Sequence, residues 1–227
     1  MKAPIAIALD GKDLATITGW IGATSPFVST MKVGLETYLR DGAAAIDAVR
    51  ATDCELFLDL KLHDIPNTVA GAARSIAHFA PQYLTVHALG GAAMIAAAAD
   101  ALPATRVTAV TILTSMDQDA LASIGINDSA LDAAVRLARL SVAAGARAIV
   151  CSPQEVAAIR AAVPADIVLI TPGVRPLGAD AGDQKRIATP EQAIADGANL
   201  VVIGRPITGA ADPAQAAAAI AAGLAAR

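Results

Sequence analysis

The sequence predicts an α/β fold, a single (β/α)8 barrel in which eight parallel strands alternate with helices. Three observations lead to this prediction. Short apolar runs, typical of strands buried on both faces, alternate with longer amphipathic or Ala-rich segments typical of helices. Eight such units fit into 227 residues, close to the usual length of one barrel. Polar and charged residues recur at or just after the ends of the apolar runs, where such barrels build their active sites.

The expected strands share a short apolar core, and a polar, charged or Gly residue lies at or just past the end of each. They are placed at residues 5–9, 27–33, 55–60, 83–87, 106–113, 147–151, 166–171 and 200–203. The first is followed by Asp10, and the second contains Lys32 just before Gly34. Because strands and helices alternate regularly, each strand is expected to run parallel to the next.

The expected helices fill the intervals between these strands. They are placed at residues 14–22, 42–51, 65–79, 92–102, 129–144 and 153–163, at a segment starting at 189, and at 213–225. Thr189, before Pro190 and Glu191, has the pattern of a helix start, with a hydroxyl cap and Pro in the first turn. No linker or low-complexity insertion interrupts the alternation, so residues 1–227 are expected to form one domain.

Composition excludes several classes of function. Hydrophobic residues make up 55% of the chain and aromatic residues 3%, so the core must consist of Ala, Val, Ile and Leu. The net charge is −4 and no basic run is interleaved with aromatic residues, which argues against a nucleic-acid partner. Charge and Gly interrupt the Ala-rich segments, so none is expected to span a membrane. Cys54 and Cys151 form no C-x-x-C pair and are expected to be buried thiols in a reducing compartment. A soluble, cytoplasmic protein is therefore expected.

Charged residues crowd the end of the third strand, in the stretch 57–68. Residues two apart in a strand point to the same face, so Asp59 and Lys61 should lie side by side, with Lys32 facing the same cavity and Asp64 near it. A lysine between carboxylates stays protonated, because opposite charges favour its charged form. Such a lysine can deliver a proton to a carbanion, whereas Schiff-base chemistry needs a neutral amine.

A simpler interpretation of the same stretch is that its charges cap the next helix. Asp64 precedes Ile65 and Pro66, and Pro is favoured at the first position of a helix. The two aspartates of the stretch could also bind Mg²⁺, but Lys32 and Lys61 would repel the ion. No cluster of side chains demands a metal, and none is expected.

An anion site is expected after the last strands. Gly204 and Arg205 follow the eighth strand, where barrels often hold a phosphate: Gly allows close approach of the backbone, and Arg offers a bidentate charge. The alternative is a tight turn with a solvated Arg. Residues 174–188 form a loop of the length typical of lids, in which Arg175 and Gln184 could donate to an anion. A mobile surface loop without function is the alternative there.

The ordered set of motifs resembles that of the orotidine 5′-monophosphate decarboxylase family. The most specific is FLDLKLHDIPNT at residues 57–68. The others, in family order, are ALD at 8–10, MKVG at 31–34, LTS at 113–115, TPGVR at 171–175, DQKR at 183–186 and IGRPI at 203–207. The resemblance covers nearly the whole chain.

The resemblance implies a dimeric (β/α)8 barrel that converts orotidine 5′-monophosphate to UMP and CO2, in pyrimidine biosynthesis, with no metal or organic cofactor. It implies that Lys61 protonates C6, that Asp59 lies beside the departing CO2, and that Lys32 holds Asp59 and touches the ribose. The resemblance also implies that Asp10 binds a ribose hydroxyl and that Asp64, with Thr68, reaches into the partner subunit's site. Thr114 and Ser115 would lie beside the pyrimidine. Arg175 and Gln184 would belong to the loop that closes over the phosphate, and Gly204 and Arg205 would cradle the phosphate.

Two rival functions are compatible with parts of the pattern. The Mg²⁺-dependent decarboxylase of 3-keto-L-gulonate 6-phosphate and its relatives resemble the chain at Asp59, Lys61 and Asp64. Those enzymes carry an acidic residue where this chain has Lys32. The lysine removes a metal ligand from this chain and adds a charge that would repel Mg²⁺. A barrel that binds phosphate without catalysis is the second rival. An unused array of buried charges is costly to keep, which argues against it.

Overall fold

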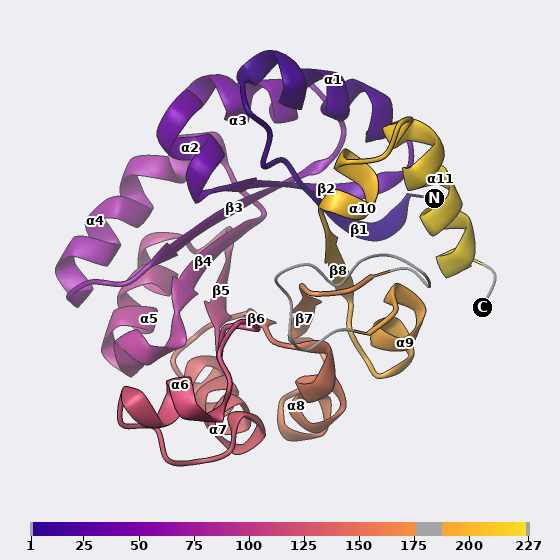
Figure 1. Cartoon of the computed structure of the whole chain (residues 1–227). Helices are drawn as coiled ribbons and strands as arrows, with labels where there is room; N and C mark the ends of the chain where they lie inside the picture. The colour runs from indigo at the N-terminus through magenta and orange to yellow at the C-terminus, as the bar shows by residue number, and fades with distance from the viewer. Residues whose placement is uncertain (1, 176–187, 226–227) are drawn as a thin grey trace.

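The structure, a computed structural model, describes residues 2–175 and 188–225 and confirms the predicted barrel. Eight parallel strands close in chain order, β1 next to β2 and onward until β8 pairs with β1 (Figure 1). The strands are β1 (Ala3–Ala8), β2 (Val28–Gly34), β3 (Glu55–Leu62), β4 (Tyr83–His87), β5 (Arg106–Val110), β6 (Ala148–Val150), β7 (Val168–Thr171) and β8 (Leu200–Ile203).

Helices surround the barrel as an outer ring (Figure 1). The α-helices are α1 (Leu14–Thr24), α2 (Leu35–Asp41), α3 (Ala43–Arg50), α4 (Pro66–Ile76), α5 (Gly91–Ala101), α6 (Gln118–Ser123), α7 (Ala130–Ala143), α8 (Val156–Ala162), α9 (Pro190–Ala195), α10 (Arg205–Thr208) and α11 (Pro213–Ala225). Short 3-10 turns are η1 (Ala77–Phe79), η2 (Ala88–Gly90) and η3 (Pro153–Glu155). Among the described residues, no helix has the length and apolar character needed to cross a membrane.

The three short helices α2, α6 and α10 were not expected from the sequence. Each has seven residues or fewer, too short to show a clear helical period. Gly34 ends the second strand as expected but also serves as the N-cap residue of α2. The expected fifth strand is too long, since β5 ends at Val110 rather than at residue 113. The expected start of the helix at residue 189 is correct, because the Thr189 side chain accepts a hydrogen bond from the Gln192 N–H.

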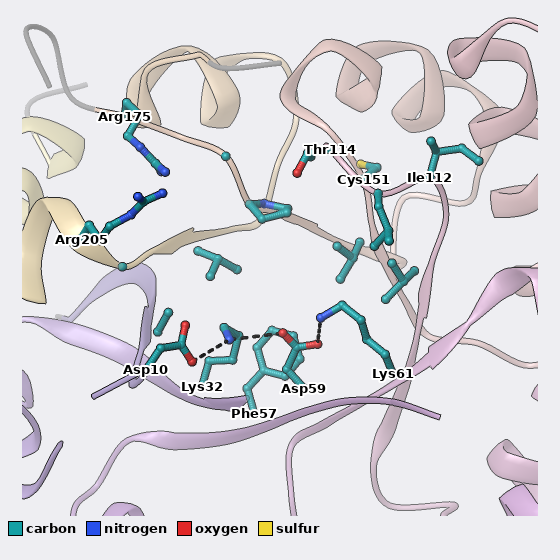
Figure 2. Close-up of a pocket in the computed structure, with 18 of the residues that line it drawn as sticks. Asp10, Lys32, Phe57, Asp59, Lys61, Ile112, Thr114, Cys151, Arg175 and Arg205 are labelled. Carbon is teal, nitrogen blue, oxygen red and sulfur yellow. Dashed lines mark hydrogen bonds and ion pairs between the residues drawn. The ribbon is translucent and has the colours of Figure 1, made fainter. Parts of the chain in front are cut away.

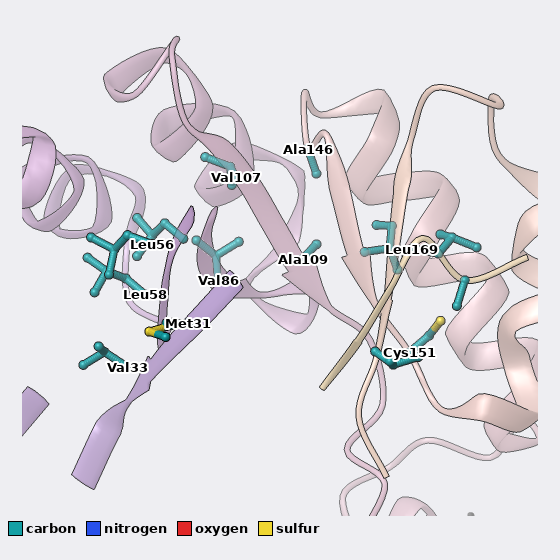
Figure 3. Packing of buried hydrophobic residues seen from close by; sticks show 14 of the residues in the cluster. Met31, Val33, Leu56, Leu58, Val86, Val107, Ala109, Ala146, Cys151 and Leu169 are labelled. Atoms are coloured by element: carbon teal, nitrogen blue, oxygen red, sulfur yellow. The ribbon is translucent and has the colours of Figure 1, made fainter. Parts of the chain in front are cut away.

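The core has two layers, as alternation along the strands requires. Most buried apolar side chains lie between the strands and the helices; Met31, Leu58, Val86 and Ala109 belong to this layer (Figure 3). A smaller cluster fills the inside of the barrel and includes Phe57 and Tyr83, whose ring centroids are 5.5 Å apart.

The inward-facing positions change character along β3. Phe57 fills the barrel, whereas the next inward residues, Asp59 and Lys61, are charged. Side chains therefore close the barrel at its N-terminal end and leave a hollow at its C-terminal end, where the active sites of such barrels lie.

Strand β3 is irregular at its charged end. Leu58 pairs with Leu84 and Leu62 pairs with Val86, so three residues of β3 face one residue of β4. Lys61, within this bulge, has a φ of +47°, in the left-handed region that residues other than Gly rarely adopt. The expectation that β3 ends at residue 60 is wrong, because pairing resumes at Leu62 after the bulge.

Candidate active site

A cavity of about 450 Å³ opens at the C-terminal ends of the strands (Figure 2). Two groups of residues that the sequence singled out line it. One group is charged and comes from the first three strand ends: Asp10, Lys32, Asp59 and Lys61. The other comes from the later strand ends: Thr114, Arg175, Gly204 and Arg205. Lys61 and Asp59 therefore line the same cavity as Arg205.

The first group forms a continuous chain of alternating charges (Figure 2). Lys32 Nζ lies 3.9 Å from Asp10 Oδ1 and 3.2 Å from Asp59 Oδ2. Lys61 Nζ donates a 2.7 Å hydrogen bond to Asp59 Oδ1. The middle of the chain is the most buried, since the side chains of Lys32 and Asp59 are 10% and 13% exposed and that of Lys61 is 31% exposed. Asp10, at the other end of the chain, is 49% exposed, so a ligand in the cavity can reach both the Asp10 carboxylate and the Lys61 ammonium.

Gly34 makes the first link of this chain possible. A Cβ on Gly34 would lie 3.0 Å from both Asp10 Oδ1 and Lys32 Nζ. These distances are tighter than ordinary contacts, so a larger residue would push the ion pair apart. Gly34 also faces Asp59 in the register of β2 and β3, which brings the two acids to either side of Lys32.

Asp59 is held in its ionised form. Burial is the largest influence on its pKa and raises it, because desolvation disfavours the carboxylate. The charges of Lys32 and Lys61, with hydrogen bonds from Lys61 and Thr85, outweigh burial and leave the pKa of Asp59 below its ordinary value. A fixed negative charge thus lies beside the Lys61 ammonium in the cavity.

Thr85 is a member of this network that sequence reasoning missed. It is fully buried in β4, and its hydroxyl donates to Asp59 Oδ1 (3.0 Å) while accepting from the Lys61 backbone N–H (2.8 Å). The alternation Tyr83, Thr85, His87 in the predicted strand could have flagged an inward hydroxyl. Nothing in the sequence indicated its two partners, because the bulge that brings them together is not visible there.

Two arginines mark the other side of the cavity. Figure 2 shows the guanidinium groups of Arg175 and Arg205 directed toward one another, across the cavity from the charged chain. Arg175 is buried, and its Nη1 donates to the carbonyl of Val174 (2.8 Å). Arg205 begins α10 directly after Gly204, at the end of β8. Two adjacent guanidinium groups are suited to bind a dianionic phosphate.

Four predicted site residues are not in this group. Asp64, Thr68 and Ser115 are exposed, and within the described part of the chain they do not line the cavity. The Asp64 carboxylate accepts the backbone N–H of Ile65 (2.6 Å) rather than an ammonium of the charged chain. Gln184 lies outside the described residues, as does most of the expected lid at 176–187.

The histidine next to the network packs against a second histidine rather than lining the cavity. The rings of His87 and His63 are stacked with centroids 5.4 Å apart. Burial, with smaller effects from His63 and Lys61, lowers the pKa of His87. His87 is therefore neutral at neutral pH. In the described residues, no three His, Cys, Asp or Glu side chains gather into a group that could hold a metal ion.

Comparison with known proteins agrees with the geometry. The family described as "Orotidine 5′-phosphate decarboxylase / HUMPS family" matches residues 3–220. An orotidine 5′-phosphate decarboxylase of Thermobifida fusca is 63% identical over 225 residues, covering 99% of this chain and 97% of that protein. One from Frankia casuarinae is 52% identical, covering 99% and 89%. The crystal structure of the Lactobacillus acidophilus enzyme of that name superposes with a TM-score of 0.85 at 34% identity, covering 98% and 99%. The chain belongs to the orotidine 5′-phosphate decarboxylase / HUMPS family.

Proposed function

We propose that this protein decarboxylates orotidine 5′-monophosphate to UMP and CO2, in de novo pyrimidine biosynthesis, without a cofactor. The observation that carries the proposal is the pairing of the Lys61 ammonium with Asp59 in the same cavity as Arg175 and Arg205. Relatives of 63% and 52% identity that carry the name of this activity support it over nearly the full chain.

The proposed chemistry follows from the charges. Loss of CO2 from C6 of the pyrimidine leaves an sp² carbanion that no adjacent carbonyl can delocalise. A fixed ammonium at Lys61 stabilises that charge and then supplies the proton, with no reorganisation at the moment of reaction. Asp59, held ionised by its neighbours, lies beside the departing carboxylate. Its partner Lys32 holds it in place from the other side.

The phosphate lies far from the reacting carbon in this scheme. The free energy of phosphate binding can order the charged chain and close the site, so that this free energy stabilises the transition state. We assign the ribose to Lys32 and Asp10, the pyrimidine to Thr114, and the phosphate to Arg175, Gln184, Gly204 and Arg205. The role of Ser115 beside the pyrimidine stays a prediction, because its side chain is exposed and does not line the cavity.

A homodimer with shared active sites is part of the proposal. Asp64 and Thr68 point to it, because both are exposed at the mouth of the barrel and outside the cavity of their own subunit. Large apolar side chains are exposed in the connections that follow β2, β3 and β4: Leu35 (46%), Leu39 (79%), Ile65 (67%) and Leu89 (40%). Exposed apolar groups on adjacent connections are typical of an interface between subunits. We assign Asp64 and Thr68 to the partner's site on this basis.

Two further parts of the proposal concern the chain as a whole. The alternation of strands and helices, which no linker interrupts within residues 2–175 and 188–225, supports a single decarboxylase domain over residues 1–227. The thiols of Cys54 and Cys151 form no disulfide, which supports a reducing, cytoplasmic location.

The Mg²⁺-dependent alternative is not favoured by the geometry. Its metal would need Asp59 and Asp64, but Asp64 is exposed and bonded to its own loop. Asp59 is already contacted by two ammonium groups, at 2.7 and 3.2 Å, which would repel a divalent cation.

The direct test is the fall in ultraviolet absorbance when the protein is mixed with orotidine 5′-monophosphate. We expect turnover that EDTA leaves unchanged and that added Mg²⁺ does not stimulate. No turnover of this nucleotide would reject the proposal. Inhibition by EDTA that Mg²⁺ relieves, together with turnover of 3-keto-L-gulonate 6-phosphate, would favour the alternative.

A further inference from the structure

We infer that Thr85 is a positioning residue of the decarboxylation site, whose hydroxyl fixes the backbone of Lys61 and the carboxylate of Asp59 relative to one another. The inference rests on the proposed function, because it assigns Thr85 a part in the same reaction. Three observations carry it: the bulge in β3, the two hydrogen bonds of one buried hydroxyl, and a matched threonine that lacks these partners.

The bulge leaves a backbone group that the sheet cannot satisfy. Between the pairs Leu58–Leu84 and Leu62–Val86, the regular ladder of β3 and β4 is interrupted. Lys61 lies in this interval with a φ of +47°, a conformation that persists only where its surroundings impose it. Its N–H donates to the Thr85 hydroxyl (2.8 Å) instead of to a strand carbonyl. The side chain thus replaces a ladder hydrogen bond at the strained residue.

The same hydroxyl also holds the carboxylate. A threonine hydroxyl has one hydrogen to donate, and Thr85 commits it to Asp59 Oδ1 at 3.0 Å. That oxygen also accepts the hydrogen bond from Lys61 Nζ, at 2.7 Å. The three groups close a ring that runs from the Lys61 amide through Thr85 and Asp59 to the Lys61 ammonium. Because the ring ties both ends of Lys61 to one carboxylate oxygen, the ammonium has little freedom to leave its position.

Thr108 provides the matched comparison. It faces Thr85 in the register of β4 and β5, and both side chains are fully buried. The Thr108 hydroxyl donates to the carbonyl of Arg106 on its own strand (2.9 Å). A buried threonine in this layer of the barrel is therefore not tied to the charged chain by its position alone.

The experiment compares four variants in steady-state turnover of orotidine 5′-monophosphate. Thr85→Val removes the hydroxyl and keeps the shape, whereas Thr85→Ser and Thr85→Ala both lack the methyl and differ only in the hydroxyl. Thr108→Val is the control for loss of a buried barrel hydroxyl. We expect Thr85→Val and Thr85→Ala to lower kcat by about ten- to a hundredfold, the range for a lost hydrogen bond to a charged group. Thr85→Ser and Thr108→Val should stay within about threefold of the unmodified protein.

The pH profile separates positioning from a merely structural role. Asp59 is faced by Lys32 from β2 and by Lys61 from its own strand. Asp10 contacts Lys32, and the charge of Lys61 contributes to the lowered pKa of His87 on β4. Because the Thr85 hydrogen bond favours ionised Asp59, its loss should move the acid limb of the kcat/KM profile to higher pH. Thr85→Ser and Thr108→Val should leave that limb in place.

Three results would overturn the inference. The first is equal kcat for Thr85→Ser and Thr85→Ala. This comparison remains informative even if Thr85→Val does not fold. The second is a loss in Thr108→Val as large as that in Thr85→Val. The third is an acid limb that does not move in Thr85→Ala. If the unmodified protein turns over its nucleotide and the Thr85 variants match it, only this inference is rejected; if the unmodified protein shows no turnover, the proposed function is rejected with it.

Discussion

Lys61 donates a 2.7 Å hydrogen bond to Asp59, two residues earlier on the same strand, although its backbone has left the regular β conformation. In a regular strand, the long side chain of a lysine two residues after an aspartate can adopt several directions, and only some of them reach the carboxylate. The bulge and Thr85 fix the Lys61 backbone at one orientation, so that the ammonium reaches the carboxylate and still lines the cavity.

Removal of the Lys61 ammonium should abolish turnover. We expect Lys61→Ala to lower kcat by more than about a thousandfold, because both stabilisation of the carbanion and its protonation are lost. The assay is the absorbance change with orotidine 5′-monophosphate, together with calorimetric titration of UMP, whose binding should remain measurable. Lys12→Ala, at an exposed lysine, should retain full activity. Substantial turnover by Lys61→Ala would remove its assignment as the acid.

Removal of the Arg205 guanidinium should weaken recognition of the phosphate. We expect Arg205→Ala to lower kcat/KM by about ten- to a hundredfold, the cost of a lost charge-assisted hydrogen bond. Binding of UMP should weaken in parallel, whereas binding of uridine, which has no phosphate, should be unchanged. The control is Arg136→Ala, an exposed arginine on α7 paired with Asp128. Equal losses for UMP and uridine would place Arg205 outside the phosphate site.

Neutralisation of Asp59 should destabilise the fold in a pH-dependent way. Asp59→Asn leaves Lys32 and Lys61 without their shared counter-charge, and breaking a buried pair costs about 3–5 kcal/mol of unfolding free energy. Because the folded pKa of Asp59 is lowered, its contribution is present above the unfolded pKa and is lost as pH falls through the folded pKa.

Urea unfolding from pH 7 down to pH 3 measures this difference. The gap between the unmodified protein and Asp59→Asn should be full near pH 7 and shrink only in the acid range. Asp47→Asn, at an exposed acid 3.8 Å from Arg50, should change stability by less than about 0.5 kcal/mol. A gap that is independent of pH would contradict the role given to the Asp59 charge.

Replacement of His87 should flatten the pH dependence of stability. Burial lowers the folded pKa of His87, so the unfolded chain binds its proton more readily. Stability of the unmodified protein should therefore fall as pH drops below about 6.5, and His87→Gln should lack this component. Urea unfolding between pH 7.5 and pH 4.5 measures it. His78→Gln, at an exposed histidine, should keep the original slope; the same slope in His87→Gln would show that His87 is not desolvated.

Mixed dimers test where Asp64 acts. Lys61→Ala and Asp64→Ala should each be inactive alone. If Asp64 completes the partner's site, a heterodimer of the two has one site with both residues intact. Random mixing should then restore about a quarter of full activity, since half of the dimers are mixed and each has one working site. No restoration in a confirmed heterodimer would assign Asp64 to its own subunit.

The fold class, the approximate place of the strands and most members of the charged chain can be predicted from the sequence. Apolar runs and their polar ends are local features, and a parallel barrel brings all strand ends to one face whatever the details of packing. The sequence alone therefore assigns Lys32, Asp59 and Lys61 to one cavity. The short helices α2, α6 and α10 were missed because so few residues show no period.

How those charges are joined depends on contacts between strands that are distant in the sequence. The bulge in β3 and the positive φ of Lys61 arise from pairing with β4, which lies more than twenty residues later in the chain. Thr85 is chemically unremarkable in sequence and acquires its role only because that bulge turns the Lys61 N–H and the Asp59 carboxylate toward it. Register between strands depends on packing of the whole barrel, so no local pattern could have placed this hydroxyl between its two partners.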